Sequence, residues 1–198
     1  MSTQPSPYTE LQLDALRELA NIGSGQAAAA LSSLLGKAVD ISVPTAALLP
    51  LNDAVAVAGE PDDERHGILV PIVGDMLASV VLLVPDADAH TLTAVYGLDP
   101  HSADGRSMLQ EVGNIVGTSY INVLAQMTGM ALEPSPPQVT HDMLGAILAS
   151  VLLGRGSDLE VALILDSDLR VEEEECSISF LLLPDTGGVD DLLTRIGL

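Results

Sequence analysis

Residues 14–22 read DALRELANI and residues 107–115 read SMLQEVGNI, so a stretch near the N-terminus returns 93 positions later. Within these stretches the offset aligns Glu18 with Glu111 and Asn21 with Asn114, and beyond them it aligns Leu31 with Leu124, Gly36 with Gly129 and Pro44 with Pro137. The runs LLVPD at 82–86 and LLLPD at 181–185 match at a slightly larger offset. Self-similarity at a fixed spacing indicates a duplication. We therefore predict one domain over 1–198, built from halves at about 8–98 and 102–198.

Each half is expected to open with a long helix. The first is predicted from Ser6 and Pro7 to Gly36, and the second from Ser102 or Asp104 to Gly129. Strands are predicted at 38–43, 67–73, 77–84, 159–165 and 174–183, and short helices at 87–96 and 189–196. The apolar run 142–153 has no evident counterpart in the first half and is interpreted as an insertion. This order predicts an α+β fold with a pseudo-twofold duplication, in which two long helices pack on a β-sheet.

The composition is acidic and poor in aromatic residues. The formal net charge is −21, and Lys37 is the only lysine. Nucleic-acid binding and anionic membrane surfaces are disfavoured, because both need basic patches. Such an acidic excess is tolerated best where salt screens it, which predicts a halophilic, archaeal-type cytoplasm. Residues 1–7 lack the features of a signal peptide, and the apolar runs are too short to span a bilayer, so we expect a soluble cytoplasmic protein.

The two long helices are predicted to be amphipathic. At about 100° per residue, Asp14, Asn21 and Gly25 lie on the same side of the first helix as Glu18, opposite an apolar stripe. The second helix repeats the pattern with Ser107, Glu111, Asn114 and Thr118. Asn is a poor residue inside a helix, which makes its return in Glu-x-x-Asn-Ile informative. The nearby glycines are interpreted as bare backbone for an approaching partner: Gly23, Gly25, Gly113 and Gly117.

This pattern resembles the CheC, CheX and FliY phosphatase family, whose signature is Asp or Ser, three residues, Glu, two residues, Asn, twenty-two residues, Pro. Both copies match without a gap, as Asp14, Glu18, Asn21, Pro44 and as Ser107, Glu111, Asn114, Pro137. Two intact copies are typical of CheC.

The resemblance implies that the protein dephosphorylates the aspartyl phosphate of a CheY-type response regulator in chemotaxis. The family assigns the orientation of the hydrolytic water to Asn21 and Asn114, and the docking of the regulator to Glu18 and Glu111. Asp14, Ser107, Pro44 and Pro137 would support the motif. No metal or cofactor of its own is implied, because Mg²⁺ is expected in the regulator.

A rival role stays open. CheC-type proteins are also partners of the receptor deamidase CheD, and the resemblance places that contact on the extra helix, with Met143 and Ile147 as candidates. Packing of these residues in the core is an equal alternative. A motor-switch structural role is weaker, because both signatures are complete.

Other sites are not expected. The four histidines, His66, His90, His101 and His141, have no metal-ligand spacing, so no metal site is predicted. Cys176 stands alone and is interpreted as a small buried hydrophobe.

Overall fold

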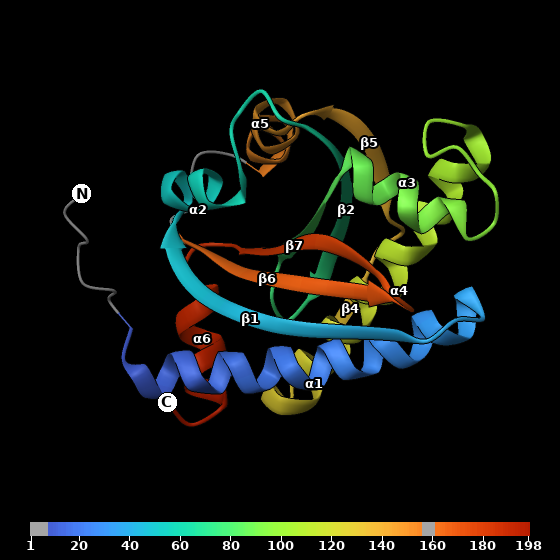
Figure 1. The fold of residues 1–198 in the computed structure, drawn as a ribbon. Coiled ribbons are helices and arrows are strands. Elements are labelled where there is room, and N and C mark those ends of the chain that lie inside the picture. Colours follow the sequence, from blue (N-terminus) through green and yellow to red (C-terminus); the bar gives the residue numbers. More distant parts are fainter. Residues whose placement is uncertain (1–7, 156–160) are drawn as a thin grey trace.

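The computed structural model describes residues 8–155 and 161–198. The first half contains α1 (Glu10–Leu35), β1 (Val39–Pro50), α2 (Leu51–Ala58), β2 (Glu64–Gly74), β3 (Ala78–Pro85) and α3 (Asp86–Ala94). The second half contains α4 (Ala103–Thr128), β4 (Leu132–Pro134), β5 (Gln138–Met143), α5 (Leu144–Arg155), β6 (Val161–Val171), β7 (Glu174–Pro184) and α6 (Gly188–Arg195). Figure 1 shows the two long helices crossing one side of a curled sheet.

Local capping sets the ends of the long helices. Helix α1 begins after Thr9, whose side chain accepts from the backbone N–H of Gln12 in a capping box. The helix thus begins later than predicted, and Ser6 and Pro7, the predicted start, lie outside the described residues. The other ends agree with the prediction. Ser102 caps α4, and Gly36 and Gly129 end the helices in the left-handed conformation, with φ of 63° and 68°.

The sheet carries the duplication in its strand order. The strands lie in the order β1-β6-β7-β3-β2-β4, β5 also pairs with β2, and all pairs are antiparallel. The repeat equates β1 with β4 plus β5, β2 with β6, and β3 with β7. Under that correspondence the order is the same from either end, so a pseudo-twofold axis passes between β3 and β7. Strand β1 of the first half pairs with β6 of the second half, and β4 and β5 of the second half pair with β2 of the first half. These pairings interlock the two halves.

One prediction about the repeat needs correction. The apolar run 142–153 is not an insertion, because α5 begins 93 residues after α2, and both helices follow the edge strand of their half. Helix α2 is thus the counterpart of α5. The eight-residue α2 reads LNDAVAVA, too short for its helical period to stand out beside the long strand before it.

Helices cover the sheet on both faces. The larger apolar cluster joins α1 and α4 to one face, and α3 and α6 contribute to it through residues such as Leu92 and Leu192. The smaller cluster joins α5 to the other face, together with Ala58 of α2. Strand β3 is buried on both sides, with Val80 and Leu82 in the first cluster and Val81 in the second. Among the described helices, none has the length and apolar composition needed to cross a bilayer.

Candidate functional site

The first copy of the motif lies on the solvent side of α1. Glu18 and Asn21 are both exposed and one helical turn apart. The opposite side of the helix is buried, as its amphipathic sequence predicts, through Leu16, Leu19, Ala20, Ala27 and Leu31. Asp14 is exposed and accepts a 2.6 Å ion-pair hydrogen bond from Arg17. The carboxylate and amide of the Glu18–Asn21 pair thus face outward.

The second copy lies on α4 and is more enclosed. Glu111 is exposed, whereas Asn114 is half-buried. The Ser107 hydroxyl donates to the Ala103 carbonyl at 3.0 Å, within its own helix. The Gln110 side-chain amide donates to the Pro137 carbonyl at 2.7 Å. The loop between β4 and β5 is therefore fixed against the helix beside Glu111.

Both motif prolines occupy interruptions in edge strands. The pairing of β1 with β6 shifts register between Ser42 and Thr45, a break that spans Pro44. Pro137 lies in the gap between β4 and β5, the equivalent place at the other edge. Proline has no N–H to donate, so an edge-strand break accommodates it without a lost ladder bond. The prolines shape the chain and offer no reactive group.

Three of the four glycines around the motif do not serve the role expected of them. A Cβ on Gly23 would lie 2.8 Å from the Tyr120 ring, and one on Gly113 would collide with Ile68. Gly117 is also buried, against Val70 of β2. These three glycines allow close packing of α1 on α4 and of α4 on the sheet. Only Gly25, of the four, is exposed with nothing within 4 Å of a Cβ.

The pattern of exposed groups limits the chemistry that each centre performs alone. A carboxylate accepts hydrogen bonds, and an amide both donates and accepts. Neither is a nucleophile activated by a neighbouring base. The arrangement suits a site that is completed by a second molecule, to which the helix contributes a charge and an oriented amide.

The sequence around both Glu–Asn pairs is similar to that of known proteins. The model of the CheC-like family matches residues 11–47 and 105–141, segments that contain all eight motif residues. The CheY-P phosphatase CheC of Bacillus subtilis is 30% identical over 198 residues, covering 95% of each chain. This chain belongs to the CheC-like family.

Two further similarities fit that assignment. The putative CheY-P phosphatase CheC1 of Halobacterium salinarum is 26% identical over 191 residues, which cover 93% of this chain and 96% of that protein. The crystal structure of Thermotoga maritima FliY superposes with a TM-score of 0.74 at 18% identity, covering 96% of this chain and 98% of that one. The second similarity shows that the two chains share a fold along nearly their whole length.

The apolar run proposed for partner binding divides into an exposed and a buried part. Met143 ends β5 and is 49% exposed, whereas Ile147 is 3% exposed and packs in the smaller core cluster with Leu144 and Val151. The assignment of Ile147 as a contact residue is therefore wrong, because its side chain faces the sheet. Residue type alone could not separate the inner from the outer side of so apolar a helix.

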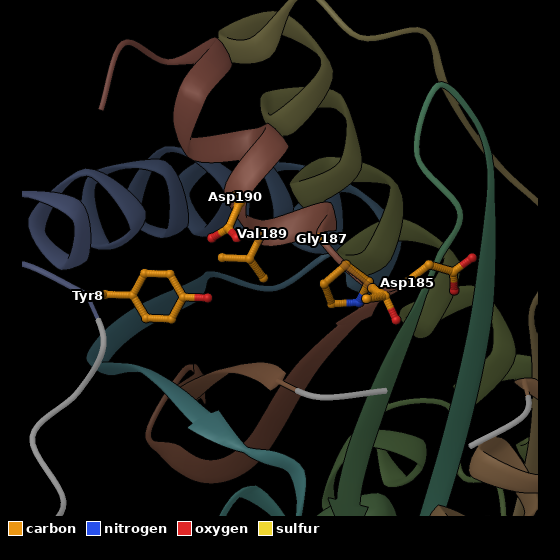
Figure 2. A pocket seen from close by; sticks show the side chains of 7 residues that line it. Tyr8, Asp185, Gly187, Val189 and Asp190 are labelled. Atoms are coloured by element: carbon orange, nitrogen blue, oxygen red, sulfur yellow. The ribbon is translucent and has the colours of Figure 1, made fainter. Parts of the chain in front are cut away.

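A surface pocket elsewhere lies between Tyr8 and the turn that leads from β7 into α6 (Figure 2). It is lined by Asp185, Gly187, Val189 and Asp190 among others, and by no motif residue. We assign it no part in the CheC-like site.

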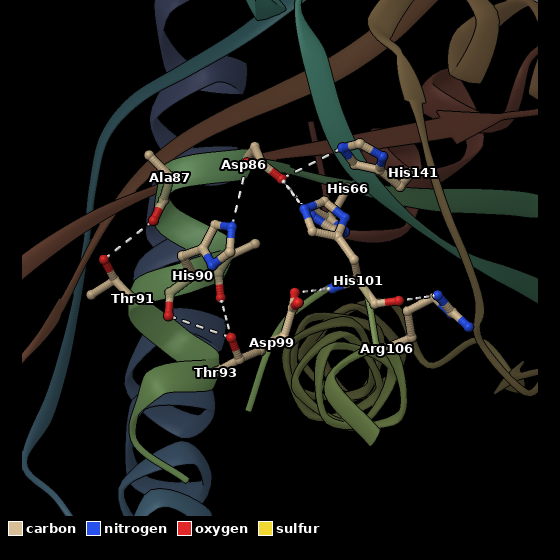
Figure 3. Close-up of polar contacts among 11 residues, drawn as sticks. His66, Asp86, Ala87, His90, Thr91, Thr93, Asp99, His101, Arg106 and His141 are labelled. Carbon is tan, nitrogen blue, oxygen red and sulfur yellow. Dashed lines mark hydrogen bonds and ion pairs between the residues drawn. The ribbon is translucent and has the colours of Figure 1, made fainter. Parts of the chain in front are cut away.

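The histidines, for which no metal-ligand spacing was found, come together in the fold. Figure 3 shows His66, His90, His101 and His141 around the carboxylate of Asp86. Linear spacing could not predict this cluster, because two of its members meet only through the pairing of β2 with β5. The fold thus gathers four histidines whose spacing in the sequence gives no sign of a common site.

Proposed function

We propose that this chain hydrolyses the aspartyl phosphate of a CheY-type response regulator. The observation that carries the proposal is the presence of two Glu–Asn pairs, exposed on α1 and with Asn114 half-buried on α4, in a chain related along its length to a CheY-P phosphatase. The proposed substrate is a protein, which agrees with motif residues that lie on open helix surfaces and not in a deep cleft.

In the proposed mechanism, Asn21 or Asn114 reaches into the regulator's active site and orients a water molecule in line with the scissile P–O bond. The water oxygen bonds to phosphorus as the bond to the aspartyl oxygen breaks, releasing inorganic phosphate and a free carboxylate. Positioning accounts for most of the rate gain in such reactions, since the transition state is loose. A neutral amide suits this role, because it holds water without placing negative charge beside the phosphoryl group.

The remaining motif residues are given supporting roles. Glu18 and Glu111 would pair with a lysine of the regulator, which fixes the register of docking. Mg²⁺ would be supplied by the regulator, because the proposed chemistry assigns no metal to the Glu–Asn pairs. Asp14, Ser107, Pro44 and Pro137 would maintain the local chain shape, as the Arg17 and Ala103 contacts of the two polar residues suggest.

The proposal is tested by the decay of a phosphorylated CheY-type regulator in high-salt buffer with and without this protein. We expect catalytic amounts of the protein to accelerate the decay. A matched control is Asn122→Ala, which removes an exposed amide of α4 outside the motif. Decay at the regulator's own rate in the presence of folded wild-type protein would contradict the proposal.

A second role, binding and regulation of the deamidase CheD, is favoured by two exposed apolar side chains near α5. Met143 is 49% exposed and Leu153 is 85% exposed, and exposed apolar side chains on a helix can dock into a partner's groove. Met143→Asp with Leu153→Asp should abolish capture of purified CheD, whereas Met127→Asp, at a 37% exposed methionine of α4, should not. Equal capture of CheD by the wild type, the Met143–Leu153 double variant and the Met127 variant would exclude this surface.

A further inference from the structure

Three imidazole nitrogens converge on one carboxylate oxygen at the edge of the sheet. The Nε2 atoms of His66, His101 and His141 lie 3.1, 3.2 and 3.5 Å from Oδ1 of Asp86. His90 lies on the other side of the carboxylate, with Nε2 3.7 Å from Oδ2. Figure 3 shows the side chains directed toward this common centre.

The fold holds these groups on four separate segments. His66 of β2 and His141 of β5 are directly opposite each other in the strand register, with ring centroids 4.5 Å apart. Asp86 is the first residue of α3, and His101 directly precedes Ser102, the cap of α4. His66 is fully buried, at 0% exposure. A buried strand, a paired edge strand and two helix starts thus position the cluster.

Hydrogen bonding within the protein does not satisfy this cluster. His66 Nε2 bonds to Asp86 Oδ1, but His66 Nδ1 and His141 Nε2 are buried without a hydrogen-bond partner among the described residues. His141 Nε2 lies 3.5 Å from Asp86 Oδ1 but does not form a hydrogen bond with it. Buried polar atoms without partners are costly, and His141 Nε2, which faces Asp86 Oδ1, is the one that a bound ion would satisfy.

The chemistry and spacing of the four ligand atoms fit a tetrahedral cation. Three imidazoles and one carboxylate form a nitrogen-rich set, which suits zinc and its first-row neighbours better than Mg²⁺ or Ca²⁺. A tetrahedral zinc site with bonds of about 2.0–2.1 Å has its ligand atoms about 3.3 Å apart. The three Nε2–Oδ1 distances are of this size, and each of the four residues offers a ligand atom within 4.8 Å of those of the other three.

We propose that His66, Asp86, His101 and His141 bind one divalent transition-metal ion, zinc in particular. The ion would join β2 and β5 to the starts of α3 and α4, and so stabilise the end of the helix that carries Glu111 and Asn114. This role is structural, since four protein ligands complete a tetrahedral zinc shell.

The test is titration of EDTA-treated full-length protein with Zn²⁺ and Co²⁺ in high-salt buffer containing excess Mg²⁺, which occupies simple carboxylate sites. We expect one equivalent of Zn²⁺ to bind and to raise the Tm, because a ligand that binds only the folded state stabilises it. Bound Co²⁺ should develop the strong visible absorption of a tetrahedral nitrogen and oxygen site. Absence of both signals in the folded wild-type protein overturns the proposal.

Variants separate this site from the acidic surface. His101→Ala and His141→Ala should each weaken zinc binding at least tenfold, and both side chains are partly exposed, which favours folding of the variants. His90→Ala is the matched control, a histidine beside Asp86 but outside the four-ligand set, and should change binding less than threefold. Unchanged binding in the His101 variant, or equal losses in all three, overturns the assignment. If a variant fails to fold, X-ray absorption of the zinc-bound wild type decides, since four nitrogen or oxygen neighbours and the outer-shell scattering of three imidazole rings are required.

Discussion

Gln110 donates a 2.7 Å hydrogen bond to the carbonyl oxygen of Pro137, which joins the helix position before Glu111 to the loop that carries the motif proline. The equivalent residue of the first half is Arg17, which instead pairs with Asp14 on its own helix. The two centres thus share a motif but have different supports. The loop at Pro137 borders the second centre, where Asn114 is half-buried, while Asn21 is exposed.

This difference predicts a selective effect of Gln110→Ala. Loss of the bond, about 0.5–1.5 kcal/mol, should free the loop beside Asn114 and lower the activity of the second centre several-fold. Asn21→Ala is the proper background, because it leaves the second centre as the only source of turnover. Gln126→Ala, at an exposed glutamine of the same helix, is the control. Equal turnover with and without Gln110 in that background would show that the loop contact is irrelevant to catalysis.

The glycines predict opposite stability changes at two sites in equivalent helices. Gly113→Ala places a methyl group against Ile68 of the buried β2 strand and should destabilise the fold by about 1–3 kcal/mol. Gly25→Ala meets no atom within 4 Å and should stabilise α1 by about 0.5–1 kcal/mol. Denaturant unfolding in high salt measures both. A neutral Gly113→Ala change would mean that α4 does not pack as closely on β2 as the structure has it.

Cys176 should be unreactive while the protein is folded. Its side chain is 3% exposed, and burial, reinforced by the carboxylates of Asp88 and Glu174, raises the pKa of the thiol from 9.0 to about 11. Alkylation at pH 8 should be slow in the native state and complete in denaturant, because the thiolate is the reactive form.

The raised pKa of Cys176 also predicts that the folded protein loses stability at high pH. The contribution of the neutral thiol is fully present below pH 9, and it is lost as the pH rises toward 11, since the unfolded chain ionises first. Rapid labelling of the native protein at pH 8 would contradict this environment for Cys176.

The acidic surface predicts salt-dependent stability. The chain has 28 acidic and 7 basic residues, and several of the basic ones are already paired, as Lys37 is with Glu172 and Arg195 with Asp191. Most carboxylates therefore repel one another unless counterions screen them. We expect the Tm to rise with KCl concentration up to the molar range, as measured by calorimetry. Undiminished stability in dilute buffer would refute the halophilic interpretation.

Repetition made much of the fold predictable. The Glu-x-x-Asn copies located α1 and α4, and the glycines at 36 and 129 marked their ends, because a left-handed cap has a strong local signature. The predicted strands overlap β1, β2, β3, β6 and β7, whereas the short strands β4 and β5 were not predicted. Helix α2 was missed, since eight residues carry little periodic signal, and the inner side of α5 could not be recognised within a uniformly apolar run.

What the sequence could not predict depends on contacts between distant segments. Gly23 is explained only by Tyr120, which lies on the other long helix. His66 meets His141 through strand pairing, and both meet Asp86 through the turn from β3 into α3. Such groupings have no regular spacing, so pattern analysis finds the repeated motif and misses the histidine cluster.

The central claim is that the two motif amides orient the attacking water. The decisive measurement is the dephosphorylation rate of a CheY-type regulator with the double variant Asn21→Ala, Asn114→Ala, compared with Asn122→Ala and with each single variant. We predict that the double variant is folded, by circular dichroism and Tm, and that its rate equals that of the regulator alone. The single variants should retain activity from the intact centre. Wild-type turnover by the folded double variant would contradict the account.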